Sequence, residues 1–214
     1  MNKAVDVIKK IRSKFRYGLV LLFIKSSIIK ALGVDIIIYH WVREGLSKDD
    51  FPELKDGLQG YSFEFLGPGD MKIIGNIKGR GDENEQKLLE HLKKGRKCLG
   101  AKYKGQVAAF TWIDLHGDSC RDHKLVLKEN EAYLYDMYTL KPFRGKNIAP
   151  YLRHQCYVKL WEMGRDVFYS STDVLNNPSI KFKRKLKARI LALYFNIKLF
   201  KKYHFNWKVK EYRK

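Results

Sequence analysis

The chain has 214 residues, of which 45% are hydrophobic and 14% aromatic. This composition suits one domain with a substantial core plus an appendage, and it excludes long disorder over most of the chain. The formal net charge of +20 lies at the two ends: residues 1–30 carry eight Lys or Arg against one acidic residue, and residues 181–214 carry thirteen against one. Residues 31–180 are nearly neutral. We therefore expect an anionic partner at one face, such as lipid headgroups, nucleic acid or an acidic carrier protein.

The first expected element is a helix over residues 3–32. Apolar residues recur there at spacings of three and four, and most lysines and arginines take the other face. Such a basic amphipathic helix suits a membrane interface, and it equally suits packing on its own domain. The apolar stretch 17–24 is shorter than the roughly 20 residues that span a bilayer, and no signal cleavage site follows it. We expect a cytoplasmic protein, with peripheral association at the inner face of the membrane as one option.

The remaining elements predict the fold class. Residues 1–58 are expected to form the N-terminal helix and a linker, with a short strand at 35–39, and residues 59–214 the main domain with a basic tail. The residue pattern predicts strands at 61–66, 97–103, 106–115, 132–140 and 166–173, and helices at 83–92, 148–163 and 176–194, followed by strand-like pieces. This order predicts an α/β (α+β) fold with a mixed, mostly antiparallel central sheet flanked by helices and one parallel pair at its centre.

The most informative run is Leu-Lys-Pro-Phe-Arg-Gly-Lys-Asn-Ile-Ala at residues 140–149, between a strand-like and a helix-like stretch. A basic, Gly-containing turn at that place gathers backbone N–H groups at the positive end of the helix dipole, which suits a phosphate or diphosphate. Gly145, Asn147 and Ala149 are small enough for ligand oxygens to approach the main chain. Arg144 and Lys146 add cationic donors.

Two motifs resemble the GNAT superfamily of N-acetyltransferases. Residues 144–149 are similar to its signature Arg/Gln-x-x-Gly-x-Gly/Ala, with Asn147 in place of the usual first glycine; Asn is the commonest non-Gly residue in left-handed backbone conformations. Residues 176–179, Asn-Asn-Pro-Ser, are similar to the family's Asn-x-x-Ser at the start of a helix. The family's later Gly-Phe reads Lys-Ala at residues 187–188, so the last third departs from the pattern. The resemblance covers roughly residues 60–207.

The resemblance implies an acyl-CoA-dependent N-acyltransferase with the GNAT fold. It implies acetyl-CoA, or another acyl-CoA, as co-substrate. A small-molecule or sugar-linked amine would attack the thioester directly through a tetrahedral intermediate, whose oxyanion needs a main-chain donor from Tyr138, Thr139 or Leu140. The residues implied to hold the donor's diphosphate are Arg144, Gly145, Lys146, Asn147, Ile148 and Ala149. Those implied to lie near its pantetheine arm are Asn176 and Ser179.

An amine acceptor must lose a proton before it attacks, so a general base is expected. Asp136 and Glu131 lie on or beside the predicted strand 132–140. Asp136 is the better candidate, because a carboxylate in an otherwise apolar strand is costly without a role; exposure to solvent or pairing with a lysine would also explain it. The tyrosine that the family often uses as general acid, four residues after the serine, is Lys183 here.

Two other functions stay open. One keeps the fold but takes a long acyl chain from an acidic acyl carrier protein, which the positive charge favours. The other is a non-enzymatic basic module that binds nucleic acid or membrane, for which lysines near Tyr203, Phe205 and Trp207 could serve. No nucleic-acid motif is recognised, which disfavours nucleic acid as a partner. We expect no metal, because the cluster His116, Cys120 and His123 falls short of the four ligands of a closed zinc site.

Overall fold

The computed structural model describes residues 34–45, 52–54, 57–77, 83–118, 125–200 and 202–212. The helix expected at residues 3–32 lies outside these ranges. The chain divides into two compact units. We call residues 46–120 and 124–169 the central unit, and residues 1–45, 121–123 and 170–214 the terminal unit.

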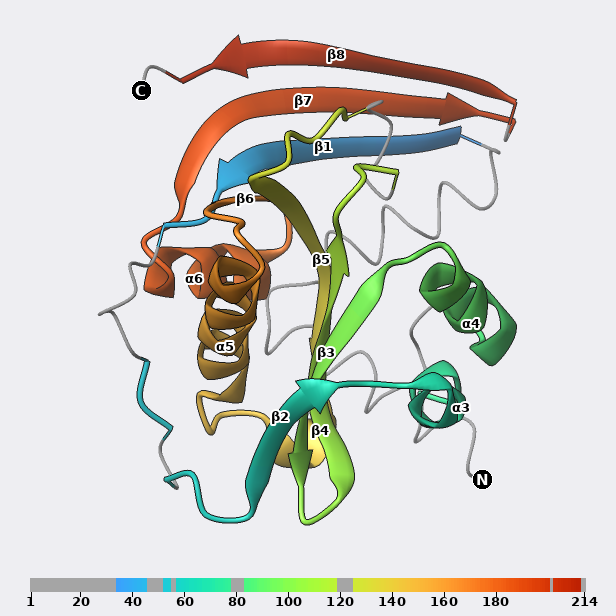
Figure 1. Cartoon of the computed structure of the whole chain (residues 1–214). Helices are drawn as coiled ribbons and strands as arrows, with labels where there is room; N and C mark the ends of the chain where they lie inside the picture. Colours follow the sequence, from blue (N-terminus) through green and yellow to red (C-terminus); the bar gives the residue numbers. More distant parts are fainter. Residues whose placement is uncertain are drawn as a thin grey trace, which may run out of the picture. The chain divides into compact units, whose positions relative to one another are not determined.

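The central unit contains the predicted hairpin and the predicted parallel pair (Figure 1). Its strands β2 to β5 are antiparallel neighbours, and β5 is parallel to the start of β6. Lys104 and Gly105 join β3 to β4 with φ of 48° and 79°, as a two-residue turn with both φ positive requires. The elements are β2 (Tyr61–Phe65), α3 (Pro68–Gly75), α4 (Glu85–Lys93), β3 (Lys97–Tyr103), β4 (Gln106–Asp114), β5 (Glu131–Thr139), the 3-10 turn η1 (Lys141–Phe143), α5 (Ile148–Glu162) and β6 (Val167–Asp173).

Helices cover both faces of the middle strands of the central unit. Figure 1 shows α5 on one side of β3, β4 and β5, and α3 and α4 on the other. β4 is accordingly buried from Val107 to its end. Its even-numbered residues Phe110 and Trp112 join a core with α3 and α4, and on the α5 side Tyr157 stacks on Phe168 with ring centroids 4.9 Å apart. The whole cluster under α3 and α4 comprises Leu66, Met71, Ile74, Leu88, Cys98, Val107, Phe110 and Trp112.

The terminal unit is built around an antiparallel three-stranded arrangement. It contains β1 (Val34–Arg43), the later part of β6, α6 (Asn177–Lys185), β7 (Arg189–Leu199) and β8 (Tyr203–Glu211). β7 is antiparallel to both β1 and β8. The complete hydrogen-bonded order is β2-β3-β4-β5-β6-β1-β7-β8. The predicted fold class, a mixed and mostly antiparallel sheet flanked by helices, is confirmed.

Strand β1 lies within the segment 1–58, where the sequence predicts a short strand at 35–39. The strand is longer than predicted, because Val34–Arg43 pairs with β7 along its whole length. The β-branched run at 36–38 marks a strand, but its partner lies about 160 residues later, and no local pattern reveals such a pairing.

The last helix is shorter than the sequence predicts. The expected helix 176–194 ends at Lys185, and β7 already begins at Arg189. Lys187 adopts φ 52°, the left-handed conformation that commonly terminates helices, and Ala188 N–H bonds back to the Lys183 carbonyl. Lys187 stands where the family pattern has glycine, so the terminating turn is kept without a glycine.

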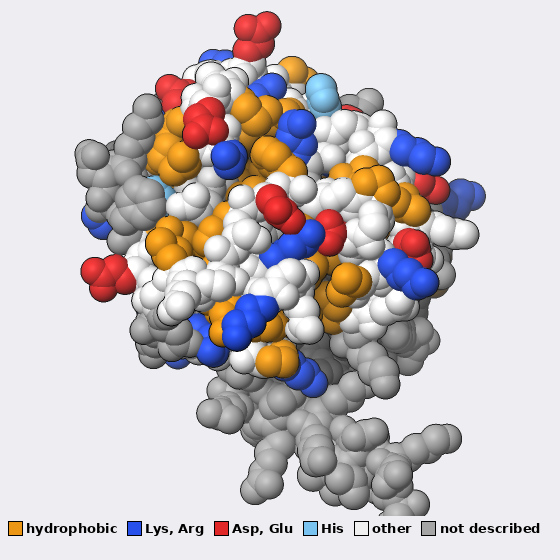
Figure 2. Space-filling view, turned by 60° about the horizontal axis from the view of Figure 1, so that its bottom comes forward, with side chains coloured by type: hydrophobic (Ala, Val, Ile, Leu, Met, Phe, Trp, Pro, Cys, Tyr) orange, Lys and Arg blue, Asp and Glu red, His pale blue; other side chains and the backbone are white. Residues whose placement is uncertain are grey.

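Opposite charges are mixed on one face of the molecule. Figure 2 shows Lys and Arg side chains interspersed with Asp and Glu and with hydrophobic patches on the face that comes forward from the bottom of Figure 1. Within the central unit, Lys102 Nζ lies 2.7 Å from Glu64 Oε1 and 3.0 Å from Asp70 Oδ1. This pairing agrees with the near-neutral charge of residues 31–180.

His91 in α4 predicts a loss of stability in mild acid. Its ring meets Trp112 edge-on at 5.3 Å, and burial, reinforced by nearby Arg96, lowers its pKa. The neutral form is favoured in the folded chain, so stability is full above the unfolded pKa of about 6.5 and falls as the pH drops below it. Urea unfolding at pH 7.5 and 5.5 should show a smaller acid-induced loss for His91→Phe than for the parent. An identical loss in both proteins would contradict this assignment.

Candidate functional site

The run of residues 140–149 forms a turn that presents backbone N–H groups at the start of α5. Gly145 has φ 86° and Asn147, the residue before the helix, has φ 64°. Glycine adopts this left-handed region freely, and asparagine adopts it more readily than other residues with a Cβ. Pro150 has no N–H, so Ile148 and Ala149 supply the first N–H groups of the 15-residue helix, which have no partner inside the helix. The helix dipole makes this end electropositive.

Two side chains of the turn form hydrogen bonds to backbone carbonyls of the central unit. Asn147 Nδ2 donates to the Glu53 carbonyl at 2.6 Å, and Arg144 Nε donates to the Thr139 carbonyl at 2.9 Å. The Arg144 guanidinium also lies over the Tyr138 ring, 5.4 Å from its centroid. The main chain at Gly145 is nevertheless open, since a Cβ built there would meet no heavy atom within 4 Å. The turn thus combines a fixed conformation with an accessible backbone, as the close approach of a diphosphate requires.

The end of β5 supplies a second set of backbone groups. The parallel ladder between β5 and β6 ends at Tyr133 and Tyr169, although β5 continues to Thr139. Leu140 N–H donates to the Ala108 carbonyl of β4 at 2.9 Å. Successive N–H groups of a strand point to opposite edges, so the N–H of Thr139 points away from β4, toward the edge where the ladder has stopped. Of the three expected main-chain donors, Thr139 is therefore directed away from β4, whereas Leu140 is engaged in the sheet.

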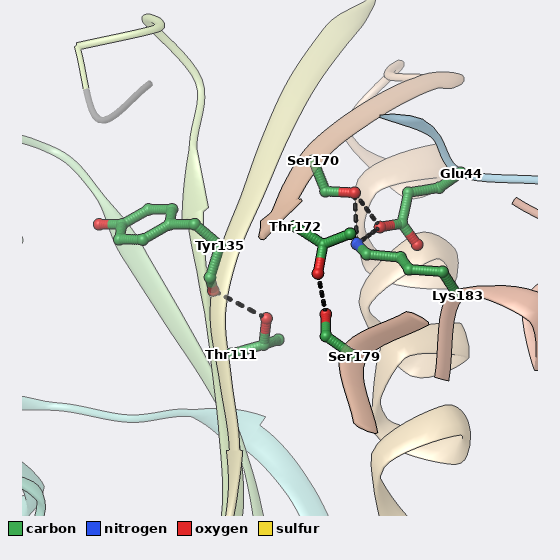
Figure 3. A network of polar contacts seen from close by, with 7 residues as sticks. All are labelled: Glu44, Thr111, Tyr135, Ser170, Thr172, Ser179 and Lys183. Carbon is green, nitrogen blue, oxygen red and sulfur yellow. Dashed lines mark hydrogen bonds and ion pairs between the residues drawn. The ribbon is translucent and has the colours of Figure 1, made fainter. Parts of the chain in front are cut away.

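Asp136 sits on a β-bulge that the sequence did not predict. Tyr138 pairs with Phe110 and Tyr135 with Trp112, so β5 has one residue more than β4 between these pairs. Asp136 is exposed and has φ 49°, and Thr111 Oγ1 donates to the Tyr135 carbonyl at 3.3 Å beside it (Figure 3). Bulges re-aim side chains and strained residues gather at active sites. The bulge thus gives Asp136 an exposed side chain and a left-handed backbone a few residues before the turn at 140–149.

Glu131, the other expected base, lies at the opposite end of β5. Its Oε2 accepts from Lys128 N–H at 3.0 Å, and its Oε1 accepts from the Tyr169 hydroxyl at 3.2 Å. Five residues of strand separate it from Asp136, about 17 Å at 3.3 Å per residue. The structure does not bring the two carboxylates together, and Glu131 holds the turn that precedes its own strand.

Asn176 and Ser179 lie in the terminal unit and shape the start of α6. Asn176 Oδ1 accepts from Ser179 N–H at 3.1 Å, which is the bond of an N-cap. Ser179 Oγ in turn accepts from Thr172 Oγ1 at 2.5 Å (Figure 3). These contacts give both residues a defined structural position.

Lys183, in the position of the family's tyrosine acid, belongs to a buried polar network of the terminal unit. Its Nζ donates to Glu44 Oε1 and to Ser170 Oγ, and the Ser170 hydroxyl donates to the same Glu44 oxygen at 2.5 Å (Figure 3). The Glu44 and Lys183 side chains are 0% and 9% exposed. The two buried charges compensate each other, so the Lys183 ammonium is engaged in an ion pair with the Glu44 carboxylate.

Comparison with known protein families shows which family the chain belongs to. A sequence profile of the acetyltransferase (GNAT) family matches residues 70–187, more than half of the chain. The chain belongs to the GNAT acetyltransferase family. The matched range includes the turn at 144–149, the bulge at Asp136 and helix α6. No curated protein matches the chain.

Solved structures agree with this GNAT assignment at the level of the fold. A Drosophila protein superimposes with a TM-score of 0.57 at 14% identity, over 84% of this chain and 57% of its own. A GNAT-family protein from Novosphingobium aromaticivorans gives 0.54 at 14% identity, over 77% and 66%. A tandem GNAT protein from the clavulanic acid biosynthesis pathway gives 0.53 at 16% identity, over 88% and 59%. The chain thus spans less than two thirds of each of these structures. The fold of the chain thus agrees with its membership of the GNAT family.

Within the described residues, no group of three or more His, Cys, Asp and Glu is placed to hold a metal ion. Cys120 and His123 of the expected cluster fall outside the described ranges. None of the helices in the described ranges has the length and apolar character to cross a bilayer. Cys98 and Cys156 are buried free thiols.

Proposed function

We propose that this GNAT protein transfers an acetyl group from acetyl-CoA to an amine. The observation that carries the proposal is the turn around Gly145. Side-chain hydrogen bonds hold this turn, its backbone is accessible, and it lies at the electropositive start of α5. The N–H groups of Ile148 and Ala149 and the side chain of Lys146 are the donors we assign to the diphosphate. Arg144, whose Nε is bonded to the Thr139 carbonyl, links this turn to the end of β5.

We place the thioester carbonyl of acetyl-CoA beside the end of β5. There the amine nitrogen attacks the thioester carbon, the new C–N bond forms, and the C–S bond breaks. The Thr139 N–H, directed away from β4, stabilises the negative charge that develops on the carbonyl oxygen. Asp136 accepts the proton that the amine loses, directly or through a water molecule. Sulfur leaves as the CoA thiolate.

The leaving group does not depend on Lys183 in this proposal. A thiol with an ordinary pKa of about 8.5 is a tolerable leaving group as the thiolate, so the step proceeds without the family's tyrosine acid. Lys183 is buried against Glu44, and we assign it to structure.

Titration calorimetry tests whether the turn at 144–149 binds the diphosphate of the donor. The chain should bind acetyl-CoA at least about 100-fold more tightly than S-acetylpantetheine, which keeps the thioester arm but lacks the nucleotide and diphosphate. Two charge-assisted hydrogen bonds of about 1.5–3 kcal/mol each account for such a ratio. Comparable affinities for the two thioesters would contradict the assignment of the turn.

The same titrations compare a second class of acyl donor with acetyl-CoA. Thirteen Lys and Arg against one acidic residue in 181–214 favour an acidic acyl carrier protein as an alternative donor. We expect acetyl-CoA to bind more tightly than an acyl carrier protein loaded with a long chain. Release of free CoA thiol on adding a panel of amines, and not without them, would establish transfer.

A further inference from the structure

Over residues 34–38 of β1, 195–199 of β7 and 203–207 of β8, one side of the terminal unit's strands carries only apolar side chains. Residues paired across antiparallel strands point to the same side of a sheet. The register gives three such rows of three, which end at Tyr203, Phe205 and Trp207 on the outer strand β8. We call this surface the apolar face. Its nine residues are Val34, Leu199 and Tyr203, then Ile36, Ile197 and Phe205, then Ile38, Phe195 and Trp207.

The apolar face is the exposed one. None of its nine residues is buried, and Ile36, Phe205, Trp207 and Tyr203 are 36%, 45%, 50% and 52% exposed. Phe205 and Trp207 stack in parallel with centroids 5.6 Å apart, which presents a flat aromatic surface. The opposite face mixes polar with apolar residues, and there Tyr39 and Asn196 are 1% and 0% exposed. A contiguous apolar surface left open on three strands marks an interaction site.

Charge on the same segment indicates the partner. Residues 181–214, which include β7 and β8, carry thirteen Lys or Arg against Glu211 alone. On β8 the exposed Lys210 pairs in register with Leu193, on the same side of β7 as Phe195, and Lys202 lies at the β7–β8 turn. Lys208 lies on the opposite side and forms an ion pair with Glu211, with 2.8 Å between Nζ and Oε2. An apolar, aromatic side bordered by lysines is the pattern of elements that lie in the headgroup region of anionic bilayers.

We propose that the apolar face docks this protein on an anionic lipid bilayer, with Phe205 and Trp207 entering the headgroup region and the neighbouring lysines contacting lipid phosphates. Aliphatic residues make up five of the nine positions, and they offer a nucleic acid nothing to stack on. A second copy of the chain would bring the same strong positive charge against itself, which repels, whereas anionic lipid attracts. The proposal is independent of acyl transfer.

Vesicle co-sedimentation with the full chain tests it. The parent should bind vesicles containing phosphatidylglycerol and phosphatidylcholine, bind pure phosphatidylcholine much more weakly, and bind less as salt increases. The double variant Phe205→Thr/Trp207→Thr should bind phosphatidylglycerol vesicles at least about tenfold more weakly. The matched control, Leu58→Thr/Ile73→Thr, changes two residues of the central unit that are 52% and 50% exposed and should bind like the parent. Unfolding midpoints of both variants verify that they are folded.

Three outcomes would overturn the proposal. One is equal vesicle binding by the parent and by the folded Phe205→Thr/Trp207→Thr variant. Another is binding of single-stranded RNA, and not of vesicles, that this variant loses. The third is a dimer in sedimentation equilibrium without lipid that the variant converts to monomer. Gly145→Val should bind vesicles like the parent, which keeps this test separate from that of the acyl-donor site.

Discussion

Replacing Gly145 by valine is expected to weaken acetyl-CoA binding at least 100-fold. Gly145 has φ 86° and open space above its Cα, so a valine side chain would occupy the volume through which a diphosphate must approach the backbone. A ligand held at van der Waals distance from the chain cannot tolerate the added isopropyl group. Titration calorimetry of the parent and the variant measures the loss directly.

Gly164 provides the matched control for this substitution. It also has positive φ, 76°, and a Cβ built there meets nothing within 4 Å. It follows the end of α5, a 15-residue helix about 22 Å long, whereas Gly145 precedes its start. Gly164→Val therefore introduces a similar backbone strain of about 1–2 kcal/mol far from the turn. Its acetyl-CoA affinity should match the parent's. If both variants lost affinity equally, strain rather than obstruction of the site would explain the effect.

The turn and the fold around it could be predicted because their signals are local. Gly145 and Asn147 are residue types suited to positive φ, Pro150 and the apolar residues after it suit the first turns of a helix, and the strands on either side are rich in aromatic and β-branched residues. Lys104-Gly105 likewise marks its own hairpin. Each of these features depends on residues within a few positions of one another, so a single sequence contains the information.

The missed features depend on partners distant in the sequence or on geometry. The bulge at Asp136 arises because two residues of β5 face one of β4, which only the register between the strands can define. The insertion of β1 beside β7 is a pairing between the two ends of the chain. The end of α6 was missed because Lys187 takes the left-handed conformation without being glycine or asparagine, so the usual stop signal is absent. Asp136 was nevertheless selected from the sequence, as a carboxylate in an apolar strand.

Lys183→Met is expected to destabilise the folded chain by about 3–5 kcal/mol. The substitution removes the cation that faces the Glu44 carboxylate, whose side chain is fully buried, and a buried charge that loses its partner carries this cost. Glu44 precedes Lys183 by 139 residues, so the pair ties β1's end to helix α6 within the terminal unit. Urea unfolding measures the loss. The exposed Lys181 on the same helix is the control, and Lys181→Met should change stability by no more than about 0.5 kcal/mol.

A double variant distinguishes the ion pair from simple packing by Lys183. In Glu44→Met/Lys183→Met no charge is left unpaired, so the loss should be smaller than the sum of the two single losses and could fall below that of Lys183→Met alone. Additive losses would mean that each side chain stabilises the fold through separate contacts. A loss below about 1 kcal/mol for Lys183→Met would mean that the ammonium is not held by Glu44, which would contradict the structural role assigned to Lys183. The stability of these variants therefore separates an ion pair with Glu44 from simple packing as the role of Lys183 within the terminal unit.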